Sequence, residues 1–211
     1  MIDKCDFWSA FVNAIGFVVF LIMISLFLSP QRVSDTEQLP IILAYTIILL
    51  AFWPIQILYH ALITPTNEMD VLRRIDRGSM LFLIAAIFTP ILWKFNQIGL
   101  GMIFIAILWI GAIVGMGMLL FIKNLSRKLT PILGFIIGII GIIGVLLNIQ
   151  NLSTQGQTLF LLGALFIILG GIVYAVKKPD IIKDIFGFHE VYHTLNLIGC
   201  IFLHFLIQSL F

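Results

Sequence analysis

Charged residues are scarce in this sequence: aspartate, glutamate, lysine and arginine together make up only 10% of its 211 residues. Hydrophobic residues make up 61%. A soluble globular domain has about 25% charged residues, so this composition excludes an ordinary soluble protein and indicates a membrane protein. The formal net charge of +2 gives no indication of nucleic-acid binding. We therefore expect membrane lipids, and no nucleic acid, as partners.

Cysteine is also rare, and the two that occur are Cys5 and Cys200. Cys5 precedes the first apolar run and Cys200 lies inside the last, so a dense disulfide framework is excluded and a bridge between the two is not expected. Neither cysteine has a partner at metal-ligand spacing. Any metal site must therefore be built from other side chains.

Long apolar runs, by contrast, are abundant. As helices rising 1.5 Å per residue they are long enough to cross ~30 Å of hydrocarbon, and the connections between them are short and polar. A transmembrane barrel is excluded, because its strands would be segments of about ten alternating residues. The sequence therefore predicts an all-α polytopic membrane protein, a single domain over residues 1–211 with seven transmembrane helices. The predicted spans are 7–28, 40–63, 78–95, 98–121, 129–148, 157–176 and 188–210.

The positive residues are unequally distributed between the two ends of these spans. Ten of the 12 lysines and arginines fall on the side that holds the N-terminus and the second, fourth and sixth connections. Only Arg32 and Lys94 fall on the other side. Because cytoplasmic connections carry the excess of positive charge, we expect a cytoplasmic N-terminus and an external C-terminus, in the plasma (inner) membrane.

Three of the four histidines lie near the predicted cytoplasmic ends of the spans. His60 is close to the end of the second span, Asp76 stands at the start of the third, and His189 and His193 open the seventh. Residues four apart share a helix face, so His189 and His193 can direct two nitrogens at one point. Zinc takes three or four nitrogen or oxygen ligands at ~2.0–2.2 Å. His60 would supply a third nitrogen, and Asp76 would bind directly or hold a water.

Other interpretations of these histidines are weaker. The string HEVYH, residues 189–193, matches the zinc-protease pattern in which the glutamate, here Glu190, is a general base, but no third protease ligand follows within reach. The histidines would also suit simple hydrogen bonding at the headgroup boundary, although chance would have scattered ionisable residues over both leaflets. His204 lies roughly 16 Å deeper than His193. We expect it to be a lone, buried, hydrogen-bonded histidine.

Two groups of residues have structural interpretations. Arg73, Arg74 and Arg77 are expected to mark the cytoplasmic face and to contact anionic headgroups. Small residues at helical spacing in the fifth span are expected to let neighbouring helices approach closely. These are Gly134, Gly138, Gly141 and Gly144.

Four short motifs occur in order along the chain: Tyr59-His60, Ile75-Asp76, LIAAIFTP from Leu83 to Pro90, and HEVYH from His189 to His193. Together they resemble the hemolysin III family, within the progesterone and adipoQ receptor group of seven-span proteins. The receptor branch of this group binds zinc through three histidines, with an aspartate holding a water. The resemblance therefore implies Zn²⁺ bound by His60, His189 and His193, with Asp76 as the water partner.

The resemblance also bears on activity, because the related alkaline ceramidases hydrolyse lipid amides with a similar site. Two positions depart from the family pattern. Gln56 stands where the family often has a serine, and Arg77 follows Asp76 where histidine or tyrosine is frequent. Both positions are close to the expected water. The departures therefore affect the inference of hydrolysis more than the inference of zinc binding.

Three functions are compatible with these residues. The first is a zinc-dependent hydrolase of lipid amides or esters in the inner leaflet, with Asp76 as the catalytic proton acceptor. The second is a non-catalytic regulator or receptor in which zinc holds three helices together. The third, a pore-forming cytolysin, is disfavoured because a pore needs a continuous polar lining and the outer halves of these spans carry almost no polar residues.

Overall fold

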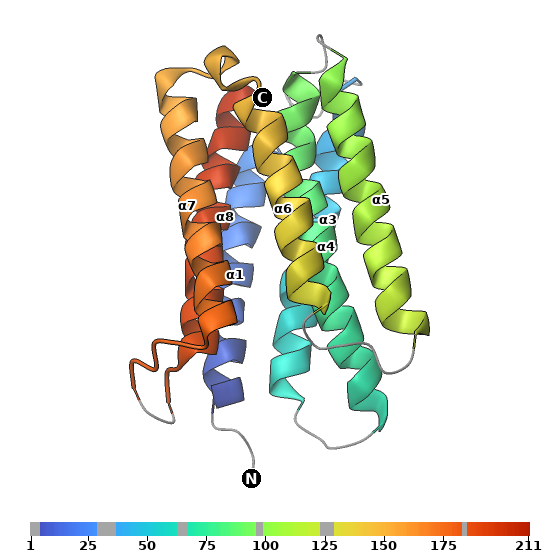
Figure 1. The fold of residues 1–211 in the computed structure, drawn as a ribbon. Coiled ribbons are helices and arrows are strands. Elements are labelled where there is room, and N and C mark those ends of the chain that lie inside the picture. Colours follow the sequence, from blue (N-terminus) through green and yellow to red (C-terminus); the bar gives the residue numbers. More distant parts are fainter. Residues whose placement is uncertain (1–4, 29–36, 63–66, 96–98, 123–128, 183–184) are drawn as a thin grey trace.

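The computed structural model describes residues 5–28, 37–62, 67–95, 99–122, 129–182 and 185–211. Within these residues the chain is helical and forms no named strand, apart from one isolated bridge between Ile182 and Phe186. Seven helices are long and apolar enough to cross a membrane, so the predicted all-α, seven-span class is confirmed. A short 3-10 turn, η2, follows the fifth of them. In chain order the elements are α1 (Cys5–Phe27), α3 (Leu39–Ala61), α4 (Asn67–Lys94), α5 (Leu100–Phe121), α6 (Leu129–Leu146), η2 (Ile149–Asn151), α7 (Thr154–Val176) and α8 (Phe188–Leu210) (Figure 1).

Helices α4 and α7 begin earlier than their predicted spans, because polar residues precede the apolar run and belong to the helix or cap its start. The third span was predicted over 78–95, but α4 begins at Asn67. Its first turns are rich in Glu, Met, Leu and Arg, which favour helix but are not apolar enough to belong to a hydrophobic run. The sixth span, predicted from 157, begins at Thr154 because the Ser153 side chain accepts a hydrogen bond from the Gly156 N–H at 3.1 Å.

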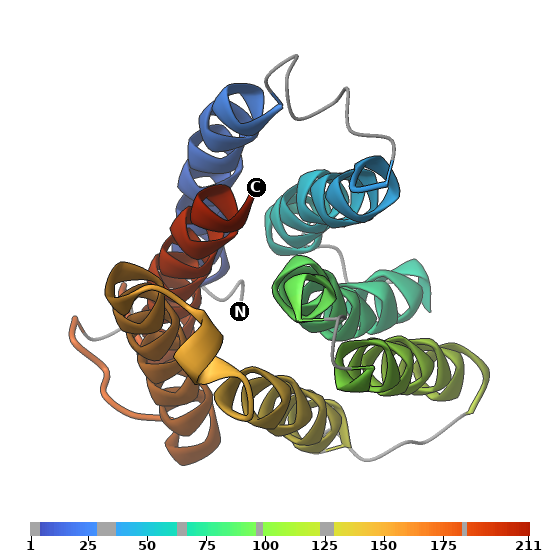
Figure 2. The same ribbon diagram turned by 90° about the horizontal axis from the view of Figure 1, so that it is seen from above.

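The helices form a closed ring in chain order. Each of them packs against the next, and α8 returns to pack against α1, as the view from above shows (Figure 2). Helix α4 also contacts α6 and α8 across the ring. In an apolar stretch of 18 residues within α4, 67% of the residues are buried, against 17% in the corresponding stretch of α7. Helix α4 is therefore the central element, since fewer than half of the residues are buried in the corresponding stretches of the other six helices.

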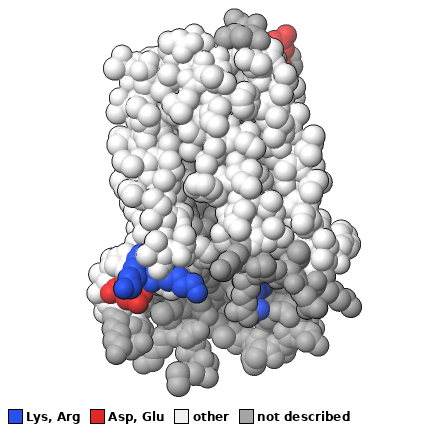
Figure 3. Space-filling view, in the orientation of Figure 1, with Lys and Arg blue, Asp and Glu red and all other residues white. Residues whose placement is uncertain are grey.

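The two chain ends lie at opposite ends of the bundle, and the connections α3–α4, α5–α6 and α7–α8 lie at the end that holds the N-terminus (Figure 1). The lysine and arginine side chains that can be seen on the face drawn in Figure 3 lie toward this same end. Lys94 lies at the opposite end of α4, with its ammonium 4.8 Å from the ring centroid of Phe211. This arrangement agrees with the charge asymmetry, while the assignment of this end to the cytoplasm stays a prediction. Of the 12 lysines and arginines in the sequence, six lie outside the described residues: Lys4, Arg32, Lys123, Arg127, Lys128 and Lys183.

Glycines of α6 allow a close approach to the central helix. A Cβ added at Gly141 would lie 2.5 Å from the Phe88 ring, and one at Gly144 would lie 2.9 Å from Leu92. The predicted packing role is confirmed for these two positions. At Gly138, by contrast, an added Cβ would meet nothing within 4 Å.

Candidate metal centre

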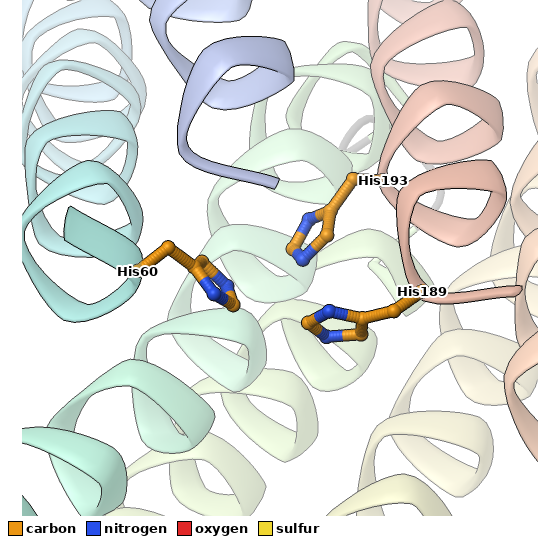
Figure 4. Close-up of side chains that lie close together, drawn as sticks. All are labelled: His60, His189 and His193. Carbon is orange, nitrogen blue, oxygen red and sulfur yellow. The ribbon is translucent and has the colours of Figure 1, made fainter. Parts of the chain in front are cut away.

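Three imidazoles meet at the end of the bundle that holds the N-terminus. Helix α3 supplies His60 from its last turn, and α8 supplies His189 and His193 from its first two turns. One ligand atom from each residue lies within 4.8 Å of those of the other two. The ring centroids are 5.1 Å apart for His60 and His189, 5.1 Å for His60 and His193, and 4.7 Å for His189 and His193. Figure 4 shows the three rings converging on a common space between the two helices.

The chemistry of this group fits a zinc ion. Zn–N bonds of ~2.0–2.1 Å in a tetrahedral site would place two bound nitrogens roughly 3.4 Å apart, so the observed set is somewhat wider than a metal-bound one. His60 and His193 are only 3% and 5% exposed. His193 Nε2 is buried and has no hydrogen-bond partner among the described residues. Such a nitrogen is costly to bury unpaired, and a metal bond would satisfy it.

Asp76, the fourth predicted site residue, lies beside this group and not within it. It is buried on α4, and its carboxylate interacts electrostatically with His60. It does not belong to the set of ligand atoms within 4.8 Å of one another. Its Oδ1 is buried without a hydrogen-bond partner in the described part of the chain. This placement suits a carboxylate that reaches the centre through a water better than a direct ligand.

Gln56 connects α3 to the turn that holds Asp76. Its Nε2 donates to the Asp76 backbone carbonyl at 3.3 Å and lies 3.2 Å from Ser79 Oγ. The Ser79 hydroxyl in turn donates to the same carbonyl at 2.6 Å. Ser79 was not identified from the sequence. Its position one turn after Asp76 on a buried helix was the available signal, because i and i+3 residues share a face.

Glu190 has a structural role at the start of α8. It is fully buried, and its Oε2 accepts from the Gly187 N–H at 2.9 Å, which satisfies a backbone donor that the helix start leaves unpaired. Its Oε1 accepts from the Ser9 hydroxyl at 2.7 Å. Because both carboxylate oxygens are engaged, the interpretation of HEVYH as a protease motif with Glu190 as general base receives no support.

Ser9 of α1 is a second residue that sequence reasoning missed. It is fully buried, and its Oγ lies 3.1 Å from His189 Nδ1 as well as 2.7 Å from Glu190 Oε1. The available signal was the pair Ser9 and Asn13, two polar residues four apart in an otherwise apolar run. Such a pair marks the face of a helix that turns toward other helices.

His204 does not take part in the centre. It is fully buried, its Nδ1 lies 2.7 Å from the Tyr45 hydroxyl, and its ring packs against Phe20 and Phe27. The prediction of a lone, buried, hydrogen-bonded histidine is confirmed.

Arg73 and Arg74 donate hydrogen bonds within the protein. Arg74 Nη1 donates to the backbone carbonyls of Leu119 at 2.9 Å and of Ile122 at 3.2 Å, at the C-terminal end of α5. A cation there satisfies unpaired carbonyls and complements the helix dipole. Arg73 Nε donates to the Tyr59 hydroxyl at 3.3 Å. Arg74 therefore binds the end of α5, a role that the sequence did not predict, and the contact of the arginines with headgroups stays a prediction.

Fold and side chains together define a seven-span integral membrane protein with a cluster of three histidines at one end, two of them buried and one half-buried. The chain matches the haemolysin-III related family over residues 4–205. It belongs to that family, in agreement with the resemblance of its motifs. No individual curated protein matches the chain.

Proposed function

We propose that His60, His189 and His193 bind Zn²⁺ near the cytoplasmic face, and that this centre hydrolyses a lipid amide or ester of the inner leaflet of the plasma membrane. The observation that carries the proposal is the meeting of three imidazoles within 4.8 Å beside the buried carboxylate of Asp76. When bound, zinc supplies Lewis-acid activation of water and of the substrate carbonyl.

The surrounding residues have distinct tasks in this proposal. Three protein ligands leave one of four tetrahedral positions open, as in catalytic zinc sites. Asp76 Oδ1 would accept a proton from the water as its oxygen adds to the carbonyl carbon, and would then give that proton to the leaving amine or alcohol oxygen as the C–N or C–O bond breaks. Gln56 and Ser79 hold the backbone of Asp76 in place through its carbonyl. Arg77 is adjacent in sequence and keeps a positive charge close to the carboxylate.

An apolar cavity next to this turn supports a lipid as substrate. It has a volume of about 110 Å³ and lies between α3, α4 and α5. Its polar lining residue is Ser79, the residue that also bonds the Asp76 carbonyl. An acyl chain in the cavity would bring its polar linkage toward the centre. The lining residues are Ile48, Ala51, Phe52, Ile55, Ser79, Phe82 and Met116.

Metal analysis of detergent-purified protein tests the first half of the proposal. We expect close to one zinc per chain, and loss of that zinc in the double variant H189A/H193A. The matched control is H204Q, which alters a buried histidine bonded to Tyr45 and should retain the metal. A wild-type protein that stays metal-free after addition of zinc would refute the site.

A hydrolysis screen tests the second half. Zinc-loaded protein in detergent or nanodiscs is expected to release fatty acid from a ceramide-like amide or from an ester, and a chelator should stop the release. A zinc-loaded protein that turned over no lipid in a broad screen would rule out the hydrolase.

A structural role for zinc is the alternative, and the packing of the helices favours it. The main partners of α3 are α1 and α4, and those of α8 are α7, α1 and α4. The histidines therefore join two helices that are not main packing partners of each other. If zinc only holds the helices together, D76A would lower thermal stability; in the hydrolase, D76A would lose activity and keep the fold and the zinc.

A further inference from the structure

Helix α1 reaches the candidate centre through the side chain of Ser9. Its hydroxyl oxygen is 2.7 Å from Glu190 Oε1 and 3.1 Å from His189 Nδ1, so a single buried hydroxyl bridges a carboxylate and a ring nitrogen. Ser9 and Glu190 are both fully buried. In such surroundings each hydrogen bond requires a defined donor and a defined acceptor.

The donors and acceptors in this chain can be assigned one by one. Glu190 Oε2 already accepts from the Gly187 N–H, and Oε1 accepts from the Ser9 hydroxyl. A serine hydroxyl has one proton, and here that proton is directed to Glu190. The contact of Ser9 with His189 Nδ1 must then use a lone pair of the serine oxygen. Nδ1 of His189 therefore carries the hydrogen, and the lone pair of the neutral ring lies on Nε2.

We propose that Ser9, backed by Glu190, is a positioning residue that holds His189 in the Nδ1–H form, so that this histidine binds metal through Nε2. Metal-ligating histidines commonly donate their second ring N–H to a fixed acceptor, which sets the tautomer and the ring orientation. Here the acceptor comes from another helix, α1. The part of this inference that concerns metal rests on the proposed zinc site, whereas the tautomer does not.

The tautomer can be measured in the metal-free protein. With only four histidines in the chain, ¹⁵N-histidine labelling and NMR resolve each ring, and an H189Q variant assigns His189. We expect the Nδ1–H form in the wild type and in S9T, which keeps the hydroxyl, and a mixture of both tautomers in S9A. The matched control is S25A on the same helix, because the described hydrogen bond of Ser25 goes to the Ile22 carbonyl and its loss should leave the spectrum unchanged.

The variant E190Q gives a sharper signature. The glutamine oxygen would keep the bond from the Gly187 N–H, so the amide NH₂ would face Ser9 and donate to it. Ser9 would then donate its own proton to His189 Nδ1, which reverses the tautomer to Nε2–H. If Ser9 only held α1 and α8 together and did not set the tautomer of His189, E190Q would not produce this reversal. An unchanged Nδ1–H signal in both S9A and E190Q would overturn the proposal.

Zinc affinity, measured by competition with a chromogenic chelator, tests the consequence for the metal. We expect S9A to bind zinc 10–100-fold more weakly than the wild type, as for other partners of metal-ligating histidines, and S9T and S25A to bind as the wild type does. Equal affinity in S9A and the wild type would overturn the positioning role. A wild type that binds no zinc would instead refute the proposed metal site and leave the NMR result to decide the tautomer.

Discussion

Two buried carboxylates lie near the histidines, and their surroundings give them different tasks. Both oxygens of Glu190 accept hydrogen bonds, from Ser9 and from the Gly187 N–H, so this side chain is committed to structure. Asp76 Oδ1, by contrast, has no hydrogen-bond partner among the described residues. A buried oxygen without a partner is costly and is retained where a bound group uses it. At the residue scale, Asp76 is therefore the side chain to test for catalysis.

Replacement of Asp76 by asparagine removes the proton acceptor and keeps the size of the side chain. We expect D76N to lower the rate of lipid hydrolysis by about 10²- to 10⁴-fold, the usual contribution of a general base, while zinc content stays unchanged. The measurement is fatty-acid release at saturating substrate, with zinc content and melting temperature recorded in parallel. A D76N protein that hydrolyses lipid at the wild-type rate would show that this carboxylate does not accept the proton.

At the scale of elements, the site depends on α4, which carries Asp76 and Ser79 one turn apart and receives a hydrogen bond from Gln56 of α3. Arg74 ties the start of this helix to the end of α5 through the carbonyls of Leu119 and Ile122. Nearer the other end of the bundle, glycines in the last turns of α6 bring that helix close to α4. Close packing supplies much of the stability between membrane helices, because lipid is as apolar as their side chains.

Alanine at Gly141 tests this close packing. The new methyl group would lie 2.5 Å from the buried Phe88 ring, so we expect a loss of about 1–3 kcal/mol in unfolding free energy. The control is G138A, where nothing lies within 4 Å and the better helix propensity of alanine should leave stability equal or slightly higher. Unfolding in mixed detergent measures both. Equal stability of the two variants would contradict the packing of α6 on α4.

At the scale of the whole molecule, the candidate centre joins helices from the two sides of the ring, α3 and α8. A ligand that binds only the folded state stabilises it by RT ln(1 + [L]/Kd). Zinc at 100 times its dissociation constant is therefore expected to add about 2.7 kcal/mol and to raise the melting temperature, and a chelator should reverse the change. Thermal unfolding of wild type and H189A/H193A checks this, since the double variant should not respond. A melting temperature that is insensitive to zinc in the wild type would contradict the site.

The orientation of the molecule in the membrane is a second prediction at this scale. Five described basic residues lie at the end that holds the N-terminus, and Lys94 lies at the other. The five are Arg73, Arg74, Arg77, Lys177 and Lys178. We expect a membrane-impermeant thiol reagent to label a cysteine added after Phe211 from outside intact cells, in a C5S/C200S background. Labelling only after permeabilisation would reverse the assignment.

In this sequence the residues that face lipid and the residues that face other helices are both apolar. The sequence therefore does not show which face of each helix packs against its neighbours. In water, a polar stripe would mark the exposed face of each helix, but in lipid both faces are apolar. The predicted histidines were found because they are polar against that background. Ser9 and Asn13 mark a face of α1 that turns toward other helices. Ser9 was nevertheless missed, because the sequence does not say which residues lie opposite that face, and these are Glu190 and His189 of α8.

The sequence by itself determined the number of membrane crossings and the end of the bundle at which His60, His189 and His193 lie, because both follow from the length and order of apolar runs. The tertiary structure alone decided that these imidazoles meet, that Asp76 stands beside them, and that Ser9 contacts His189. Contacts between helices depend on which face each helix presents to its neighbours, and that is set by the packing of the whole ring.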